Sequence, residues 1–479
     1  MTRIAIDPIS RVEGHGKITL HQDDQQRITQ ARLHIAEFRG FEKFIQGRPY
    51  WEVPVLVQRL CGICPVSHHL AAAKATDMLL GIKQLSPVAE KMRRLMHYGQ
   101  VLQSHALHFF HLSSPDLLFG FDDEVRHRNI VGVLEDYPEL ARQGVLLRKY
   151  GQEVIRLTSG KRIHGTGAIP GGINKNLSTA ERDELLKDID QVVVWGEASV
   201  ALISRLFAEQ REYHEQFATI DTNMMSLVQP NGALELYDGG LRARSADNRI
   251  IFDHQPDRDY VDLLNEHVEN WSYMKFPFIK SLGVDKGWYR VGPLARVNNC
   301  DSIDTPLAEK ARLDYRNLNP GALVQYTLTY HWTRLIELLH CAEKIRELLH
   351  DPDLQGDDLT QQGELQSTGI GVIEAPRGTL FHHYEIDEQG LITKANLIVS
   401  TTNNNRAMNE SIRQVANQYL NGHQLTEPLL NQLEVAVRAY DPCLSCATHA
   451  LGQMPLEVGL YNAQGQLIDH HLKDAGHGA

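Results

Sequence analysis

Two Cys-x-x-Cys pairs lie at opposite ends of the chain, and they constrain its fold more than any other feature. Cys61 and Cys64 occur in "RLCGIC", and Cys443 and Cys446 occur in "DPCLSC". This spacing lets both sulfurs of a pair face one ion from a single tight turn, and four thiolates suit a soft or borderline metal. If one ion binds both pairs, the fold must bring the two ends of the chain together.

The pairs alone leave the chemistry open. A structural zinc site usually draws its ligands from one local segment, whereas these ligands come from opposite ends of the chain. Structural zinc, an iron–sulfur cluster, a catalytic thiolate-bound metal and no metal at all remain as alternatives. The other two of the six cysteines, Cys300 and Cys341, have no close partner in the sequence and are expected to be small buried residues.

Composition narrows the class of protein. The chain has 479 residues, of which 42% are hydrophobic and 23% charged, which suits a folded protein with a large core. Its formal net charge of −12 disfavours nucleic acid and anionic membrane surfaces as partners. The N-terminus shows no apolar signal segment, and no apolar run approaches the roughly 18 residues of a membrane span. We therefore expect a cytoplasmic protein without direct membrane insertion.

Hydrophobic periodicity predicts an α+β fold that is predominantly α-helical, with a long central helix bundle and small peripheral β-sheets. The start of the chain, 3–22, is expected to form strand, turn and strand, and 369–402 a hairpin with "DEQG" as its turn. Ser178 or Thr179 is a plausible cap of a long helical stretch. Apolar residues recur at helical spacing in 68–82, 88–112, 177–217, 321–351, 405–420 and 428–441.

The cysteine motifs have further residues in common with a known family. They read "RLCGICPVSHH" at 59–69 and "DPCLSCATHALGQMP" at 441–455, and they accompany "DPISRVEGH" at 7–15 and "FRGFE" at 38–42. Together these motifs resemble those of the large subunit of nickel–iron hydrogenases, over essentially the whole chain. The sequence looks most like the large subunit of the cytoplasmic NAD-reducing (bidirectional) hydrogenases. The resemblance implies the fold of that subunit.

The resemblance also implies a nickel–iron centre. Cys61 and Cys443 would be terminal nickel ligands, while Cys64 and Cys446 would bridge nickel to an iron that carries carbon monoxide and two cyanide ligands. Thiolates suit nickel, whereas no side chain supplies such strong-field ligands to the iron. Dihydrogen would split heterolytically at the centre, and the thiolate of Cys443 is the expected proton acceptor.

Two charged residues are implied as catalytic groups. Glu13 in "RVEGH" matches the proton-gate glutamate of the family, and a carboxyl group beside a thiolate in a dry site suits a proton relay. Arg377 in "EAPRG" matches the arginine above the open face of the metals, where a guanidinium can donate hydrogen bonds without losing its charge. Local sequence alone would favour a surface turn for Glu13 and a surface hairpin for Arg377.

Further residues are implied around the metals. Pro376 and Asp116 resemble the residues that, together with the arginine, cover the open face of the metals in the family. Asp116 has a helix N-cap as its alternative role. Thr401 falls where the family places a hydroxyl donor to a cyanide. At this point the chain departs from the commoner pattern, because Ser400 replaces a proline and Asn403 replaces a tryptophan.

A histidine and a second metal site complete the implied machinery. His68, four residues after Cys64, resembles the histidine that hydrogen-bonds a bridging thiolate; His69 is its rival for that role, and the spacing favours His68. Glu42, the backbone carbonyl of Leu397 and the imidazole of His449 match a magnesium-type site near the C-terminus.

The C-terminal tail is expected to be removed. In the family the chain is cut after the histidine of "CATH", so 1–449 would form a single mature domain and 450–479 a cleaved extension. The implied partners in this maturation are nickel-loading proteins and a dedicated protease.

The implied activity is reversible cleavage of H2. The chain shows neither a dinucleotide fingerprint nor a phosphate loop, and its two spare cysteines are scattered. Iron–sulfur clusters, FMN and NAD are therefore expected on flavin-bearing diaphorase subunits and on a small iron–sulfur subunit. A related hydrogenase that uses NADP or a deazaflavin is the alternative. More remote alternatives are a structural-zinc protein and a structural subunit of the respiratory complex I type, which lacks the cysteine pairs.

Overall fold

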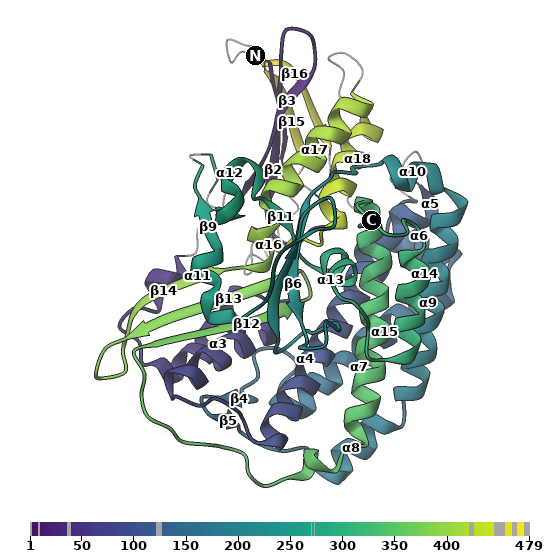
Figure 1. The fold of residues 1–479 in the computed structure, drawn as a ribbon. Helices are drawn as coiled ribbons and strands as arrows, with labels where there is room; N and C mark the ends of the chain where they lie inside the picture. Colours follow the sequence, from purple (N-terminus) through teal and green to yellow (C-terminus); the bar gives the residue numbers. More distant parts are fainter. Residues whose placement is uncertain are drawn as a thin grey trace.

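Long helices form one flank of the molecule. In the computed structural model, α4 (Pro87–Leu107), α7 (Pro138–Ser159), α9 (Ile189–Glu209) and α15 (Tyr330–Leu349) pack side by side, with α14 (Pro306–Arg316) against α15 (Figure 1). Gly99 and Gly151 allow α4 and α7 to approach closely, since a Cβ on Gly151 would lie 2.7 Å from the carbonyl oxygen of Gly99. The expected helix bundle and the α+β class are confirmed. The structure describes residues 2–7, 10–35, 40–120, 127–269, 271–272, 274–420, 426–444, 456–461 and 467–473.

The apolar stretch 177–217, expected as one or two helices, forms α8 (Thr179–Leu186), α9 and α10 (Arg211–Gln216). Ser178 caps α8 as expected: it accepts from the backbone N–H of Glu181, whose side chain accepts from the backbone N–H of Ser178.

By length and composition alone, the stretch 179–209 could also cross a membrane, since an 18-residue window within it has a mean hydropathy of 1.3, although the sequence patterns singled out no such stretch. Here, however, α9 packs against α15 and buries Val192, Ile203 and Phe207 in the main core. A helix that packs into the interior of a protein meets the same criterion of length and apolarity.

A three-stranded sheet on the opposite flank carries α3 (Pro65–Leu79). Its strands β12 (Thr368–Ala375), β13 (Gly378–Ile386) and β14 (Ile392–Ile398) form an antiparallel meander (Figure 1). The expected "DEQG" turn joins β13 to β14, but the predicted hairpin has a further strand, because the chain also reverses at Pro376 and Arg377. Gly371 lets β12 lie close on α3, since a Cβ there would collide with the carbonyl oxygen of Ala71.

Both ends of the chain meet in a five-stranded sheet at one end of the molecule. Its order is β16 (Leu467–Lys473), β15 (Leu456–Tyr461), β1 (Thr2–Asp7), β2 (Gly16–Gln22) and β3 (Ile28–Ile35), and all neighbours are antiparallel. The first two strands along the chain are those expected from the sequence. The helices α17 (Asn405–Tyr419) and α18 (Glu427–Ala439) pack against each other, and α17 also contacts β3.

Shorter elements complete the fold. A four-stranded mixed sheet has the order β11 (Tyr289–Arg290), β6 (Asn223–Val228), β7 (Gly240–Arg244) and β8 (Ile250–Gln255). The two-stranded pairs are β9 (Leu264–His267) with β10 (Phe276–Ile279) and β4 (Ala168–Ile169) with β5 (Gly172–Ile173). The short helices are α1 (Phe41–Phe44), α2 (Val53–Leu56), α5 (Ser114–Phe119), α6 (Ile130–Asp136), α11 (Tyr260–Leu263), α12 (Gly283–Lys286), α13 (Pro293–Asn299) and α16 (Ser400–Asn403).

Candidate metal centre

The segment that follows β1 lies directly against the segment that follows α18. Glu13 forms a parallel β-bridge with Cys443, and the backbone N–H of Leu444 donates to the carbonyl oxygen of Glu13 at 2.9 Å. The guanidinium of Arg438 reinforces this contact by donating to the carbonyl oxygens of Ser10 at 2.8 Å and Arg11 at 3.2 Å. The two ends of the chain therefore meet through backbone contacts, and the predicted proton-gate residue lies beside the third motif cysteine.

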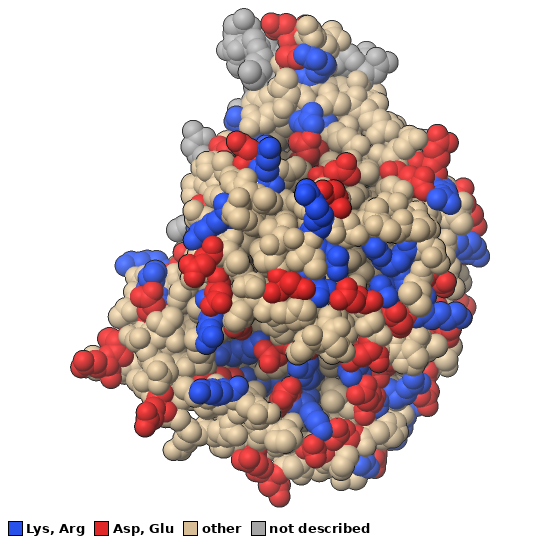
Figure 2. Space-filling view, viewed as in Figure 1, with Lys and Arg blue, Asp and Glu red and all other residues tan. Residues whose placement is uncertain are grey.

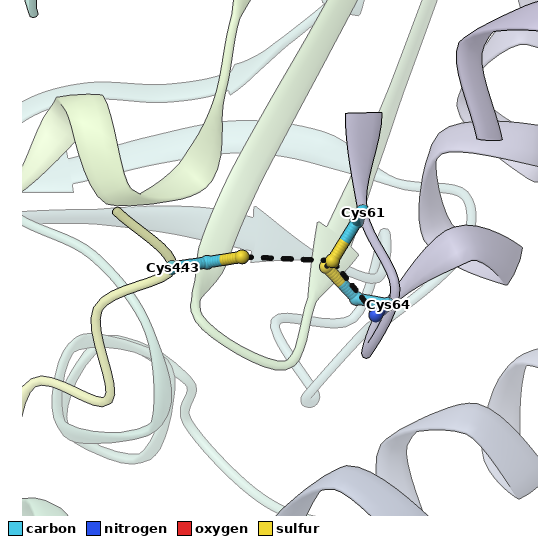
Figure 3. Close-up of side chains that lie close together, drawn as sticks. All are labelled: Cys61, Cys64 and Cys443. Carbon is cyan, nitrogen blue, oxygen red and sulfur yellow. Dashed lines mark hydrogen bonds between the residues drawn. The ribbon is translucent and has the colours of Figure 1, made fainter. Parts of the chain in front are cut away.

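Three of the four motif cysteines converge in the interior (Figure 3). The Sγ atoms of Cys61, Cys64 and Cys443 lie within 4.8 Å of one another. Backbone N–H groups of Ile63 and Cys64 donate to the sulfur of Cys61 at 3.3 and 2.9 Å, which stabilises negative charge on that sulfur. The fourth ligand of the prediction, Cys446, lies outside the described residues.

The electrostatics of the cluster fit a bound cation. Hydrogen bonds with Cys443 and Cys61, together with burial, raise the pKa of the Cys64 thiol well above its usual value. Three adjacent buried thiols can all ionise only if a positive charge compensates them, and metal binding supplies that charge while releasing protons. Because the donors are sulfur atoms in a dry interior, the site suits a soft or borderline transition metal.

Arg377 lies beside this cluster at the turn between β12 and β13. Its Nη2 donates to the carboxylate of Asp441 at 3.1 Å, while its buried Nε and Nη1 have no partner among the residues that the structure describes. Burial alone would lower the pKa of Arg377, but Asp441 and the cysteine thiolates raise it well above its usual value. The guanidinium therefore stays charged and has unused donors. The surface-hairpin alternative for Arg377 is wrong, because the side chain is buried.

A buried ion-pair network that the sequence did not reveal fixes the turn that carries Arg377. Arg296 donates to the carboxylate of Glu337 at 2.6 Å and to Glu374 at 2.8 Å, and also to the carbonyl oxygens of Ala375 at 2.9 Å and Pro376 at 3.3 Å. Burial alone would raise the pKa of Glu337, but Arg296 lowers it to about 2, so the pair is ionised. Pro376 thus contributes a carbonyl acceptor as well as a rigid turn.

Thr401 lies beside the third cysteine. Its hydroxyl oxygen accepts a hydrogen bond from the backbone N–H of Cys443 at 3.0 Å, and its own hydrogen remains available to an acceptor in the site. Asn403, which stands at one of the positions where the chain departs from the family pattern, bonds Tyr289 at 2.6 Å and the carbonyl oxygen of Thr379 at 2.9 Å. The substituted residue is therefore held in a buried polar network.

The two adjacent histidines have different environments. His69 Nδ1 lies 2.7 Å from the carbonyl oxygen of Pro54, and its Nε2 accepts from the backbone N–H of Ala168 at 3.0 Å. Both of its ring nitrogens are thus engaged by backbone groups. His68 Nδ1 contacts His382 Nε2 at 3.1 Å, and burial lowers the pKa of His68 to about 4, although negative charge on Cys61 would raise it. These contacts favour His68 over His69 for the role beside a thiolate.

Asp116 lies inside α5, whose N-cap is Ser113, so its alternative role as an N-cap is wrong. Its carboxylate instead forms ion pairs with Arg11 and with Arg438, the latter at 2.6 Å. Asp116 therefore fixes the N-terminal segment against α18. No sequence pattern indicated this contact, because the partners lie far apart in the chain.

Two residues of the predicted second metal site, Glu42 and Leu397, lie next to each other. The carboxylate of Glu42 accepts from the backbone N–H of Leu397 at 2.9 Å, and Lys275 lies 3.9 Å from Glu42 and 3.0 Å from Glu266. An oxygen of Glu266 is buried without a partner among the described residues, so oxygen ligands remain available there. His449 lies outside the described residues.

Comparisons with known proteins agree on one family. A family model described as nickel-dependent hydrogenase matches residues 39–119 and 237–449, and one described as HoxL-like matches residues 3–38. NAD-reducing hydrogenase HoxS subunit beta of Cupriavidus necator is 48% identical, covering 98% of this chain and 99% of the relative. An F420-non-reducing hydrogenase subunit of Methanothermobacter thermautotrophicus is 42% identical, covering 98% of this chain and 99% of the relative.

A crystal structure of an NAD+-reducing nickel–iron hydrogenase in the H2-reduced state is 59% identical to this chain and superposes with a TM-score of 0.91, covering 94% of this chain and 100% of that one. The regions matched by the family model include both cysteine motifs, and the relatives align over nearly the whole length. The chain therefore belongs to the nickel-dependent hydrogenase family and is a hydrogenase.

Proposed function

We propose that this hydrogenase is the H2-cleaving subunit of a cytoplasmic NAD-reducing complex. The observation that carries the proposal is the buried convergence of Cys61, Cys64 and Cys443 beside the unused donors of Arg377. The link to NAD rests on the NAD-reducing relatives, whose identities of 48% and 59% exceed the 42% of the F420-non-reducing relative. NAD is therefore preferred to a deazaflavin as the final electron acceptor.

The four motif cysteines are proposed to hold a nickel–iron centre. Cys61 and Cys443 would be terminal ligands of nickel, and Cys64 and Cys446 would bridge nickel to an iron carrying carbon monoxide and two cyanides. When bound, such a centre supplies heterolytic cleavage of H2. Arg377, through its unpartnered Nε and Nη1, suits hydrogen bonding to iron-bound cyanide, and the Thr401 hydroxyl is proposed to serve a second cyanide.

The proton of H2 is proposed to leave through Cys443 and Glu13. The sulfur of Cys443 would accept it, and the carboxyl group of Glu13 would carry it onward. The β-bridge between these residues supports this order, because it places the two side chains on neighbouring segments of backbone. A carboxyl group next to a thiolate can share a proton with it when little water is present.

Electrons must leave by another route. Among the described cysteines outside the motifs, Cys300 and Cys341 are buried singly in the hydrophobic core. They therefore form no ligand set for an iron–sulfur cluster that could carry the electrons away. A small iron–sulfur subunit is proposed to dock over the Cys61–Cys64 loop. At this place a hollow is lined by Gly62, Ile63, Gln100, Gln103, Arg162 and Ile163, among others.

The docking proposal has a direct test. The side chain of Ile163 is 51% exposed beside the metal site, although it is apolar. Ile163→Asp should release the iron–sulfur subunit from the purified complex, whereas Ile250→Asp, at a similarly exposed position on β8, should not. Retention of the subunit by both variants would place the interface elsewhere.

FMN and NAD are proposed to bind to diaphorase subunits of the same complex. Acidic and basic side chains are interspersed over the face seen in Figure 2, which gives nucleic acid no continuous basic surface there. A magnesium-type ion is proposed at Glu42, the carbonyl oxygen of Leu397 and His449, since carboxylate and carbonyl oxygens suit a hard divalent cation.

Removal of residues 450–479 after nickel loading is also proposed. Two strands of this extension, β15 and β16, extend the N-terminal sheet by pairing β15 with β1. Cleavage after His449 would break their covalent link to the rest of the chain. Mass spectrometry of the active complex should give the mass of residues 1–449, and an intact chain in a fully active preparation would refute the proposal.

The first measurement is an infrared spectrum of the anaerobically purified complex in the region of metal-bound carbon monoxide and cyanide. Protein groups do not absorb there, so bands would establish the iron ligands. A processed chain that lacks these bands and holds zinc in the thiolate site would refute the nickel–iron centre.

A further inference from the structure

A line of three buried hydrogen-bonding side chains begins four residues after Cys64 and ends in the apolar core. His68 lies at the start of α3, and His382 and Tyr384 lie on one face of β13, two residues apart. His68 Nδ1 is 3.1 Å from His382 Nε2, and His382 Nδ1 is 2.5 Å from the phenolic oxygen of Tyr384. The ring centroids of the two histidines are 5.4 Å apart.

The protonation states along this line follow from burial. Burial raises the pKa of Tyr384 well above its usual value, so its phenol keeps its hydrogen. Burial also lowers the pKa of His382 well below its usual value and that of His68 to about 4, so both imidazoles are neutral near pH 7. A neutral imidazole carries one N–H and one acceptor nitrogen, and only the contacts decide which is which.

Two directions of hydrogen bonding are possible along the line. If His382 donated to Tyr384, the hydrogen of the phenol would need another acceptor, and the structure gives Tyr384 no other hydrogen bond among the described residues. Its surroundings are apolar and include Ile45, Val53 and Leu79. Because a buried donor without an acceptor is costly, Tyr384 must be the donor.

Once Tyr384 donates, the rest of the line is determined. His382 Nδ1 accepts, so its hydrogen is on Nε2 and points to His68 Nδ1. His68 Nδ1 must then accept, which leaves the hydrogen of His68 on Nε2. We propose, on the basis of the proposed function, that Tyr384 and His382 are positioning residues that hold His68 in this tautomer, so that it presents an N–H donor to the thiolates of the metal site.

The direction matters chemically because the opposite tautomer would present a lone pair to a thiolate. A donor to a thiolate withdraws charge from the sulfur and hence from the metal, whereas a lone pair repels it. The line cannot serve as a proton exit, because it ends at Tyr384 in an apolar environment. Its role is therefore orientation and tuning, and it is distinct from the path through Glu13.

The tautomer can be measured in the metal-free chain. Two-bond ¹H–¹⁵N correlation of protein labelled at histidine reports which ring nitrogen carries the hydrogen, and loss of one set of signals in His68→Gln identifies His68. Hydrogen on Nε2 of His68 and of His382 is expected in the wild type. Hydrogen on Nδ1 of His68 would overturn the proposal whatever metal the mature protein binds.

A second measurement uses the infrared bands of the mature complex. Tyr384→Phe and His382→Leu should shift the carbon monoxide and cyanide bands to lower frequency, because loss of the donor leaves more charge on the thiolate and the metal. His382→Gln keeps an N–H that can reach His68 and should restore the wild-type positions. Tyr150→Phe removes another buried phenol, which donates to the carbonyl oxygen of Leu185 at 3.1 Å, and should shift nothing.

The two measurements separate the possible failures. Unshifted bands in both Tyr384→Phe and His382→Leu would show that these residues act only in packing. Absence of bands in a processed wild-type chain that holds zinc would refute the proposed nickel–iron centre but would leave the NMR result on the tautomer standing.

Discussion

Leu444 donates its backbone N–H to the carbonyl oxygen of Glu13 at 2.9 Å, and this bond joins the first motif of the chain to the last. It lies next to the β-bridge between Glu13 and Cys443, so these two residues are positioned by backbone contacts rather than by flexible side chains. Backbone contacts define distances more strictly than long side chains do, because fewer rotatable bonds intervene. The geometry of the site therefore depends on the N-terminal segment remaining in place.

Replacing a motif cysteine should abolish metal binding without unfolding the chain. Cys64→Ser removes one of the converging sulfurs and substitutes a hydroxyl group, which is a poor ligand for soft metals. We expect loss of nickel, measured by elemental analysis, together with loss of H2 oxidation. Cys300→Ser alters a buried cysteine outside the site and should retain nickel. Equal nickel in the two variants would contradict the assignment.

Arg377→Lys should keep the metal but lose most of the activity. A lysine offers one point charge, whereas the guanidinium bonds Asp441 and has two further nitrogens without partners among the described residues. Loss of one preorganised donor typically costs about 10²–10³ in kcat, and a similar loss of H2 oxidation is expected. Arg413→Lys, in a surface pair with Glu410, is the control. Full activity of Arg377→Lys would show that its charge alone suffices.

Arg296→Met should destabilise the fold. It would leave Glu337 and Glu374 buried without their cation, and breaking a buried ion pair on one side costs about 3–5 kcal/mol. The change should appear as a lower midpoint of urea unfolding. Arg205→Met, which breaks an exposed pair with Glu209, should change the free energy of unfolding by less than about 1 kcal/mol. Similar midpoints for the two variants would argue against the network.

The free energy of unfolding should fall as the pH drops from about 6.5 to 4. Burial lowers the pKa of His214 to about 4, whereas an unfolded histidine titrates near 6.5. In this window the unfolded chain binds protons that the folded chain excludes, so stability is greatest above it and declines below it. Each such histidine contributes up to about 1.4 kcal/mol per pH unit.

Urea titrations at several pH values test this expectation. His214→Gln should give a shallower dependence of the unfolding free energy on pH. His350→Gln, at an exposed position, should keep the slope of the wild type. Equal slopes in all three proteins would mean that His214 does not contribute.

Much of the site was predictable because short motifs carry its chemistry. The cysteine pairs indicated a thiolate metal site, and apolar periodicity located the helices that became α3, α4, α15, α17 and α18. Position relative to the motifs also favoured His68 over His69, and the contacts of His69 with backbone groups agree. These features depend on residues that are close together in the sequence.

The partners of the motif residues were not predictable in this way. Asp116 was expected near the metals, with a helix cap as its alternative role, and its pairing with Arg11 and Arg438 was not foreseen. The network of Arg296 behind the Arg377 turn had no sequence signal, because its carboxylates come from α15 and β12. Contacts of this kind depend on which elements pack together, and no spacing within one element reports that.

Residue types and local periodicity predicted a thiolate site and a helical fold, and the resemblance of the motifs to a known family predicted the family. The folded chain was needed to show that Glu13 and Cys443 share a β-bridge, that Asp441 bonds Arg377, and that Tyr384 contacts His382. Hydrogen bonds and ion pairs form between groups that are adjacent in space. Adjacency across a long chain is set by the packing of the whole core, which no local pattern encodes.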